Sequence, residues 1–210
     1  MLAVVAPGQG SQVPGFLTPW LELPNFEDRM KWLGTVAGID LIAHGTTSDE
    51  DTIRDTAVAQ PLIVSAGMVS LLSLFPHPGE AFAKVAVGAG HSVGEITAAV
   101  VAGVFDAETG IKFVNERGQA MAKAAALEVT SMAAVLGGDQ AEVEAKLASL
   151  ELEPANYNGG GQIVALQGQG EAVARVVSPA ILGIVELDEF GVLEEPVLHV
   201  LRVALLRQIG

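Results

Sequence analysis

The chain has 210 residues, half of them hydrophobic and 17% charged, so it has enough apolar surface to fold and does not resemble a disordered segment. Its formal net charge of −14 disfavours a broad basic surface for nucleic acid or anionic lipid. The absence of cysteine excludes disulfides, thiolate nucleophiles and cysteine-ligated zinc.

The N-terminus begins with a short apolar run, residues 2–6, that is stopped by Pro7-Gly8. Such a run is typical of a buried strand in a parallel sheet that leads into a turn. No basic region precedes it, and no apolar run reaches the roughly 20 residues of a membrane span. We therefore expect a soluble cytoplasmic protein, with chemistry in the loop that follows this strand.

The middle of the chain predicts an α/β order of elements. The sequence Gln60-Pro61 is expected to open a buried helix through residues 62–75, because proline suits the first helical position. An apolar strand over residues 84–88 then runs through a glycine-rich turn into a helix over residues 95–102. Further along, the pattern predicts a helix, a strand, a helix and two strands: residues 109–128, 132–136, 141–150, 153–157 and 163–166.

The glycine-rich turn is the strongest local signal for chemistry. It reads Gly90-His91-Ser92-Val93-Gly94, the G-x-S-x-G pattern of a nucleophile elbow between a strand and a helix. The glycines permit a strained turn, and the following helix directs N–H groups and its positive dipole end towards Ser92. The alternative is an ordinary turn with an incidental serine. His91 adjoins Ser92 in sequence, so we expect its side chain to point elsewhere.

The loop after the first strand, residues 8–12, can complement this elbow. If the two strands are neighbours in a parallel sheet, the backbone N–H groups of Gln9 and Val93 could form an oxyanion hole. The alternative is a glycine turn of no catalytic consequence. A phosphate loop is disfavoured because the lysine and Ser/Thr of the Walker pattern are missing, and no cluster has the spacing of metal ligands.

Arg117 is informative because of its expected position on a helix. At 3.6 residues per turn it shares a face with four apolar residues: Phe113, Ala120, Met121 and Ala124. An unpaired guanidinium on such a face is unfavourable, so it should meet a protein carboxylate such as Glu95 or Asp106, or a carboxylate of a ligand. Helix position alone favours the protein carboxylate.

Five ordered motifs resemble those of the malonyl transacylases of fatty acid and polyketide synthesis. They cover about residues 1–166, and Ser92 and Arg117 are 25 positions apart, as in the family. Five motifs in the family order are far more specific than any one of them. The motifs are Ala6–Gln12, Thr56–Pro61, Gly90–Glu95, Arg117–Met121 and Pro154–Val164.

The resemblance implies that Ser92 takes a malonyl group from coenzyme A and passes it to the phosphopantetheine thiol of acyl carrier protein. Arg117 would hold the free malonyl carboxylate, and Gln9 and Val93 would supply the oxyanion-hole N–H groups. No cofactor is implied, since malonyl-CoA is the substrate, and we expect a monomer without nucleic-acid or membrane partners. The remaining pocket residues would be Gln60, His91, Met121 and Asn158.

The resemblance also implies a fold, which is α/β with a parallel-sheet, hydrolase-like large domain and a partial ferredoxin-like small subdomain. The acyltransferase core with the nucleophile elbow would occupy residues 1–128. The partial ferredoxin-like lobe would occupy residues 129–180, and a divergent C-terminal segment residues 181–210.

The C-terminal segment departs from the family pattern. Family members present a catalytic histidine in a Gly-Ala-Phe-His-Thr stretch, whereas residues 183–190 contain no histidine. His199 is the only histidine downstream of Ser92 and is the remaining candidate base, although a lone histidine on an apolar face is more often a core residue. A serine without its base can lose on the order of 10⁴–10⁶ in rate, so impaired turnover is one expectation.

Two other functions are compatible with these residues. A serine hydrolase or esterase would use Ser92, Asp188 and His199 in the chain order of the α/β-hydrolases. Arg117 and the Gln9 loop argue against it. A non-catalytic, truncated homologue would keep the acyl-CoA pocket or the carrier-protein surface without chemistry.

Overall fold

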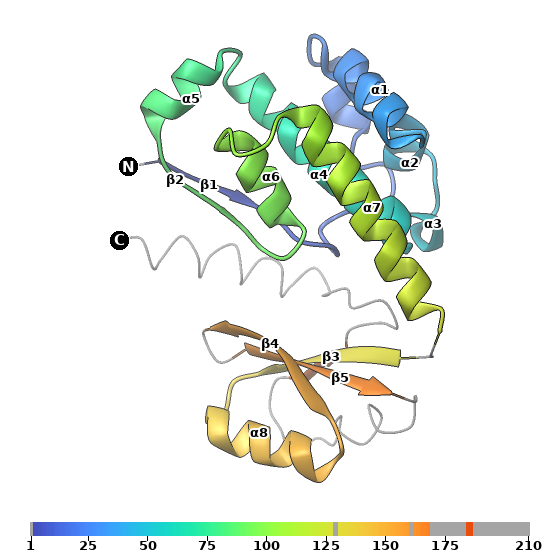
Figure 1. The fold of residues 1–210 in the computed structure, drawn as a ribbon, viewed down its shortest axis with the longest axis vertical. Helices are drawn as coiled ribbons and strands as arrows, with labels where there is room; N and C mark the ends of the chain where they lie inside the picture. The colour runs from blue at the N-terminus through green and yellow to red at the C-terminus, as the bar shows by residue number, and fades with distance from the viewer. Residues whose placement is uncertain (1, 128–129, 160–161, 169–183, 187–210) are drawn as a thin grey trace. The chain divides into compact units, whose positions relative to one another are not determined.

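The computed structural model describes residues 2–127, 130–159, 162–168 and 184–186. The chain forms two compact units, Met1–Lys123 and Ala124–Gly210. The first unit ends five residues before the expected boundary at residue 128. The described residues form helices, a parallel sheet and an antiparallel sheet (Figure 1), which confirms the α/β class.

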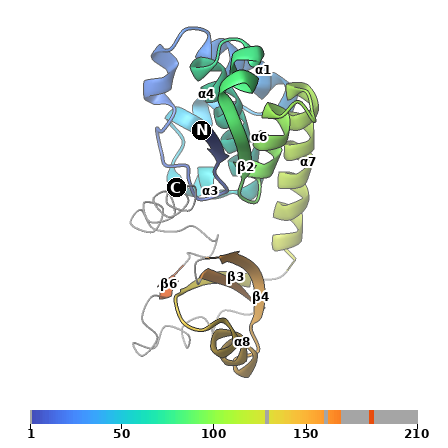
Figure 2. The ribbon, with the colours of Figure 1, turned by 90° about the vertical axis from the view of Figure 1, so that its left-hand side faces the viewer.

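The first unit combines a two-stranded parallel sheet with helices. Strand β1 (Leu2–Ala6) pairs with β2 (Val85–Gly90), so the carboxyl ends of the two strands meet at Ala6 and Gly90. The prediction that residues 2–6 form a buried strand is wrong in one respect: the strand is present, but only Ala6 is buried, because apolar composition alone does not fix which residues the fold covers. Figure 2 shows the two strands beside α6. The helices in chain order are the 3₁₀ helix η1 (Thr18–Glu22), α1 (Phe26–Ala37), α2 (Leu41–Thr46), α3 (Glu50–Arg54), α4 (Thr56–Leu74), α5 (Pro78–Lys84), α6 (Gly94–Val101) and α7 (Ala107–Ala125).

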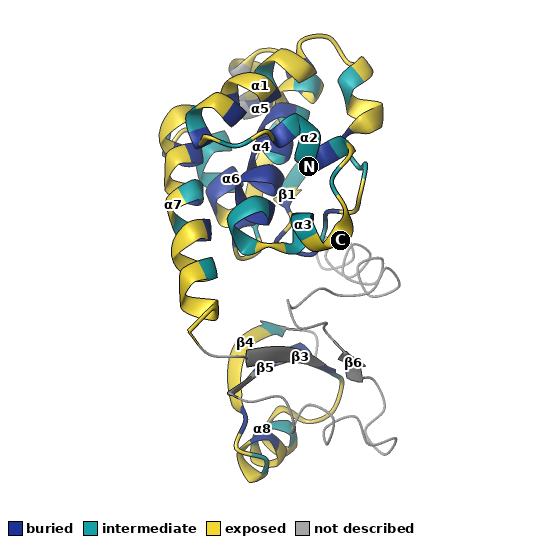
Figure 3. Cartoon of the chain, turned by 90° about the vertical axis from the view of Figure 1, so that its right-hand side faces the viewer, coloured by how far each residue is buried: buried dark blue, intermediate teal, exposed yellow. Residues whose placement is uncertain are grey.

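Helix α4 lies at the centre of this unit, and most of its residues between 59 and 69 are buried (Figure 3). Its sequence is apolar on nearly all sides, which is the pattern of a core helix. The predicted buried helix is therefore confirmed. By length and composition α4 could also cross a membrane, contrary to the sequence expectation, but 56% of its apolar window is buried inside the protein.

Helix α4 begins earlier than predicted. Asp55 precedes it and accepts the backbone N–H of Ala57 at 2.8 Å, which makes Asp55 the N-cap. Pro61 therefore lies inside the helix, and the prediction that it opens the helix is wrong. The earlier start places Thr56 and Gln60 four residues apart on one face of the same helix.

The second unit contains a four-stranded sheet of order β4-β5-β3-β6, whose pairs are antiparallel. The predicted strand, helix, strand, strand order after residue 130 is confirmed, whereas the short β6 was not predicted. The expected boundary at residue 180 lies outside the described residues. The elements are β3 (Thr130–Leu136), α8 (Gln140–Ser149), β4 (Glu153–Gly159), β5 (Gln162–Gly168) and β6 (Ile184–Glu186).

Gly94 offers a test of the packing between α6 and β1. A Cβ at this position would lie 2.5 Å from the carbonyl oxygen of Pro7, so Gly94→Ala must push the helix away from the strand. We expect this substitution to lower the free energy of unfolding in urea by about 1–3 kcal/mol, as overpacking does. Gly79→Ala in α5 is the matched control, because a Cβ there meets nothing within 4 Å. Equal stability of the two variants would contradict the proposed tight packing.

Candidate active site

Ser92 stands at the turn between β2 and α6. Its φ of +51° lies in the left-handed region, which is uncommon for a residue with a side chain. The backbone N–H of Gly94 donates to the carbonyl of His91 at 2.9 Å, and that of Glu95 donates to the carbonyl of Ser92 at 3.0 Å. Ser92 is an exposed residue. The turn thus has the strand, strained serine and helix expected of a nucleophile elbow.

The end of β1 lies directly against this elbow. The backbone N–H of His91 donates to the carbonyl of Ala6 at 3.0 Å. A Cβ at Gly8 would lie 2.9 Å from Nδ1 of His91 and 3.6 Å from Cβ of Ser92. The two sequence motifs, about 80 residues apart, therefore meet in space, as a parallel pairing of their strands requires.

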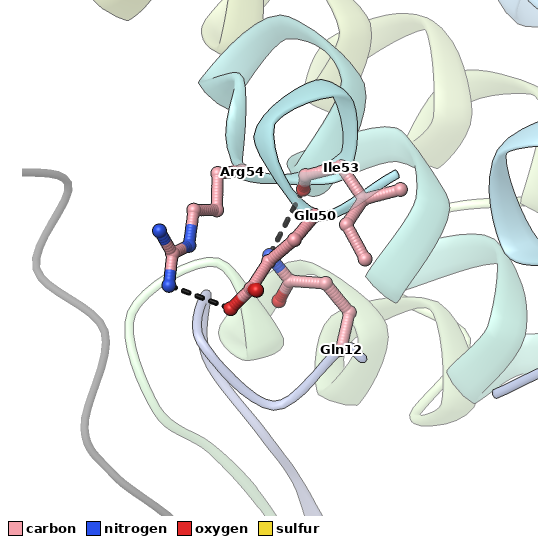
Figure 4. A network of polar contacts seen from close by, with 4 residues as sticks. All are labelled: Gln12, Glu50, Ile53 and Arg54. Carbon is pink, nitrogen blue, oxygen red and sulfur yellow. Dashed lines mark hydrogen bonds and ion pairs between the residues drawn. The ribbon is translucent and has the colours of Figure 1, made fainter. Parts of the chain in front are cut away.

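Side-chain hydrogen bonds hold the loop after β1 in one conformation. The buried amide of Gln12 accepts the backbone N–H of Gly10 at 2.9 Å and donates to the carbonyl of Ile53 at 3.0 Å. Figure 4 shows Gln12 pointing at this carbonyl, beside the ion pair between Arg54 and Glu50 at 2.6 Å. The loop is thereby anchored to α3, a contact that the sequence did not reveal.

The predicted oxyanion-hole donors lie on the two segments that meet here. The amide of Gln9 donates to the carbonyl of Arg54 at 3.1 Å and to Oγ1 of Thr56 at 3.2 Å, so its side chain is directed to α3 and α4. Within the described part of the chain, the backbone N–H groups of Gln9 and Val93 have no protein acceptor. The structure thus leaves both N–H groups without a hydrogen-bond partner among the described residues.

Arg117 lies at the edge of the buried face of α7. That face consists of Gly110, Ile111, Val114 and Gly118. The apolar face that Arg117 was predicted to share is not the buried face: Phe113 and Met121 are 51% and 44% exposed, and Ala120 and Ala124 are also exposed. Two glycines and two aliphatic side chains, rather than the larger apolar residues, turn this helix towards the core. Arg117 itself is half-buried.

A neutral amide, rather than a carboxylate, contacts the guanidinium. Nη1 of Arg117 donates to Oε1 of Gln60, which is only 1% exposed. The expected pairing with Glu95 or Asp106 is wrong: both are exposed, and Asp106 instead accepts the backbone N–H of Thr109. Among the residues that the structure describes, no carboxylate forms an ion pair with Arg117. Its positive charge therefore has no counter-ion there.

Thr56 connects the loop with the arginine. Its hydroxyl accepts the amide of Gln9, and its carbonyl oxygen would lie 2.9 Å from a Cβ at Gly118. Gly118 thus lets α7 approach the first turn of α4, so that Arg117 reaches Gln60. A chain of contacts joins Ser92, Gly8-Gln9, Thr56, Gln60 and Arg117. The sequence motifs alone predicted no role for Thr56 or Gly118, although the two residues lie in the motifs Thr56–Pro61 and Arg117–Met121.

The other predicted site residues lie outside the chain of contacts from Ser92 to Arg117 or at its edge. Asn158 lies in β4 of the second unit and donates to Oε1 of Gln162 at 2.8 Å. His91 is exposed at the elbow, and Sδ of Met121 accepts the amide of Gln60 at 3.2 Å. His199 and Asp188 lie outside the described residues. In residues 2–127, 130–159, 162–168 and 184–186, no group of three or more histidines and carboxylates could hold a metal.

This arrangement agrees with comparisons to known proteins. A family model described as "Acyl transferase domain" matches residues 4–181, and the chain belongs to this family. A malonyl CoA-acyl carrier protein transacylase of Mycobacterium tuberculosis is 50% identical over 165 residues, which cover 79% of this chain and 54% of that protein. The chain thus spans about half the length of the curated relatives it matches.

Solved structures give the same relationship. The crystal structure of MCAT from Mycobacterium tuberculosis matches with a TM-score of 0.80 at 44% identity, covering 90% of this chain and 63% of that one. A type II polyketide-synthase acyl-carrier protein in complex with its malonyl-transacylase matches with a TM-score of 0.73 at 28% identity, covering 89% and 61%. The family resemblance of the sequence motifs is confirmed.

Asp106 at the start of α7 provides a pH test of the helix that carries Arg117. The backbone N–H of Thr109 donates to its carboxylate at 2.6 Å and lowers the pKa of Asp106 below its ordinary value of about 3.9. The stabilisation is therefore complete above that ordinary value and is lost as the pH falls through the lower folded-state pKa. We expect Asp106→Ala to be less stable than the wild type at neutral pH. In urea unfolding the difference should shrink as the pH is lowered below the ordinary pKa of an aspartate; a difference that stays constant would count against this interaction.

Proposed function

We propose that this protein transfers a malonyl group from malonyl-CoA to the phosphopantetheine thiol of acyl carrier protein through a malonyl ester on Ser92. One observation carries the proposal: an exposed serine at a strained elbow is joined by a short chain of contacts to a guanidinium without a counter-ion among the described residues. The 50% identity to a malonyl CoA-acyl carrier protein transacylase, over 54% of that protein's length, supports the same reaction.

Two displacements on Ser92 make up the reaction. In the first, Oγ attacks the thioester carbon, the carbon–sulfur bond breaks, and the hydroxyl proton passes to the sulfur of coenzyme A. In the second, the carrier thiol attacks the ester, the bond to Oγ breaks, and the thiol proton returns to Ser92. Each oxyanion would accept the N–H groups of Gln9 and Val93. The atoms balance without a metal or redox group, so we propose no resident cofactor.

The guanidinium of Arg117 would select acidic acyl groups. It offers donors in a planar fork that matches a carboxylate, and a charge-assisted pair of this kind is stronger than a neutral hydrogen bond. A malonyl group supplies the missing negative charge, whereas an acetyl group leaves the half-buried cation unpaired. This feature favours a malonyl transacylase over an esterase acting on neutral esters.

A general base is needed to take the proton of Ser92 efficiently. We assign no general base among the residues that the structure describes. His199, which lies outside them, stays the candidate from the sequence. Without a base the rate would fall on the order of 10⁴–10⁶, yet a stable acyl-enzyme could still accumulate. Formation of the ester is therefore the most direct test of the first displacement.

The partner, location and wider fold follow the same proposal. A structural relative is named as a malonyl-transacylase in complex with its acyl-carrier protein, which supports a carrier protein as the acceptor. We propose a cytoplasmic monomer whose large domain has the hydrolase-like arrangement of a parallel sheet with a nucleophile elbow. Strands β3, β4 and β5 and helix α8 would belong to a ferredoxin-like lobe.

Intact-protein mass spectrometry after incubation with malonyl-CoA tests the proposal. We expect one malonyl adduct on the wild type and none on Ser92→Ala. Arg117→Ala should shift the preference from malonyl-CoA towards acetyl-CoA by about tenfold or more, because a charged hydrogen-bonded pair is lost. Absence of any adduct on the wild type would reject the transacylase proposal and leave a non-catalytic homologue, whereas hydrolysis of neutral esters in preference to malonyl-CoA would favour the esterase.

A further inference from the structure

We infer that Gln60 determines the charge selectivity of this site by holding Arg117 with a neutral acceptor. The inference rests on the proposed function and names the residue that keeps the guanidinium both positioned and uncompensated. Gln60 would be a positioning residue, because it acts on the acyl group through Arg117.

The amide of Gln60 has its two ends assigned by different neighbours. Nε2 donates to Sδ of Met121 at 3.2 Å, while Oε1 accepts Nη1 of Arg117. A thioether can only accept, and a guanidinium can only donate, so the reversed amide would set its NH₂ group against the guanidinium. Met121 therefore fixes the orientation in which the carbonyl end faces Arg117.

Packing keeps this amide in place. Gln60 is 1% exposed, and its Cβ lies 3.6 Å from the position of a Cβ at Gly118. A side chain buried at the point where Gly118 lets α7 approach α4 has few alternative rotamers, so the direction of the guanidinium is restricted as well. Only one of the five donor hydrogens of Arg117 need be used by Gln60, which leaves the others for a bidentate carboxylate.

Neutrality of the acceptor is the decisive property. A carboxylate of the same size at position 60 would form an internal ion pair with Arg117 and cancel the charge that an acidic acyl group is expected to bind. Glutamine provides the same acceptor geometry without a charge. The structure therefore explains why an amide, and not an acid, would suit this buried position next to an arginine.

The test compares acylation of Ser92 by malonyl-CoA and by acetyl-CoA in the full chain, using intact-protein mass spectrometry over time. For Gln60→Glu we expect the malonyl-to-acetyl rate ratio to fall by about tenfold or more, since the charge pair moves inside the protein. Gln119→Glu is the matched control, because the same change falls on an exposed position of α7. Its ratio should stay within about twofold of the wild type.

A second variant keeps the test decisive if Gln60→Glu does not fold. Met121→Leu preserves volume at a half-exposed position but removes the acceptor of Nε2, and should lower the ratio by about threefold while urea unfolding stays nearly unchanged. A wild-type ratio in a folded Gln60→Glu, or in Met121→Leu if the former is unfolded, would overturn the inference alone. Absence of adducts from both acyl-CoAs in the wild type would overturn the proposed function, and the inference with it.

Discussion

The close approach of α7 to the first turn of α4 is the constraint on which the rest of the site depends. Gly118 has no side chain, and the carbonyl oxygen of Thr56 occupies the space that a Cβ would need. The same turn of α4 binds the amide of Gln9 through the hydroxyl of Thr56 and the guanidinium of Arg117 through Gln60. The start of α4 therefore orients both the loop beside Ser92 and the guanidinium of Arg117.

The strained backbone of Ser92 is supported by the same kind of close backbone packing. A residue with a side chain at φ +51° costs on the order of 1–3 kcal/mol, and this conformation persists only where its surroundings enforce it. Here the hydrogen bond from His91 to Ala6 and the contact of Gly94 with the end of β1 fix both sides of the turn. The exposed Ser92 is thus presented by a rigid frame rather than by a loop that has to close.

Local patterns predicted the elements around the nucleophile, whereas tertiary packing decided the partners of Arg117. The strand and the turn at Ser92 follow from short-range signals and were predicted correctly, but the expected burial of β1 and β2 is wrong, because most of their residues are not buried. The start of α4 was predicted too late, at Pro61, because the N-cap at Asp55 begins the helix at Thr56. The face of α7 was misassigned because glycines that pack closely carry no hydrophobic signal. The contact between Gln60 and Arg117 joins residues 57 positions apart, which no local pattern reveals.

The net charge of −14 makes this single cation more important than its size suggests. An acidic surface repels the phosphates of coenzyme A and a carboxylate-bearing acyl group at long range, but salt screens that repulsion beyond about 8 Å. Recognition must therefore come from short-range contacts, where a half-buried guanidinium acts in a medium of lower polarity than water. A neutral amide beside Arg117 preserves that attraction, and an internal carboxylate would remove it. Selectivity for an acidic acyl group would then depend on the absence of a protein carboxylate next to Arg117 as much as on Arg117 itself.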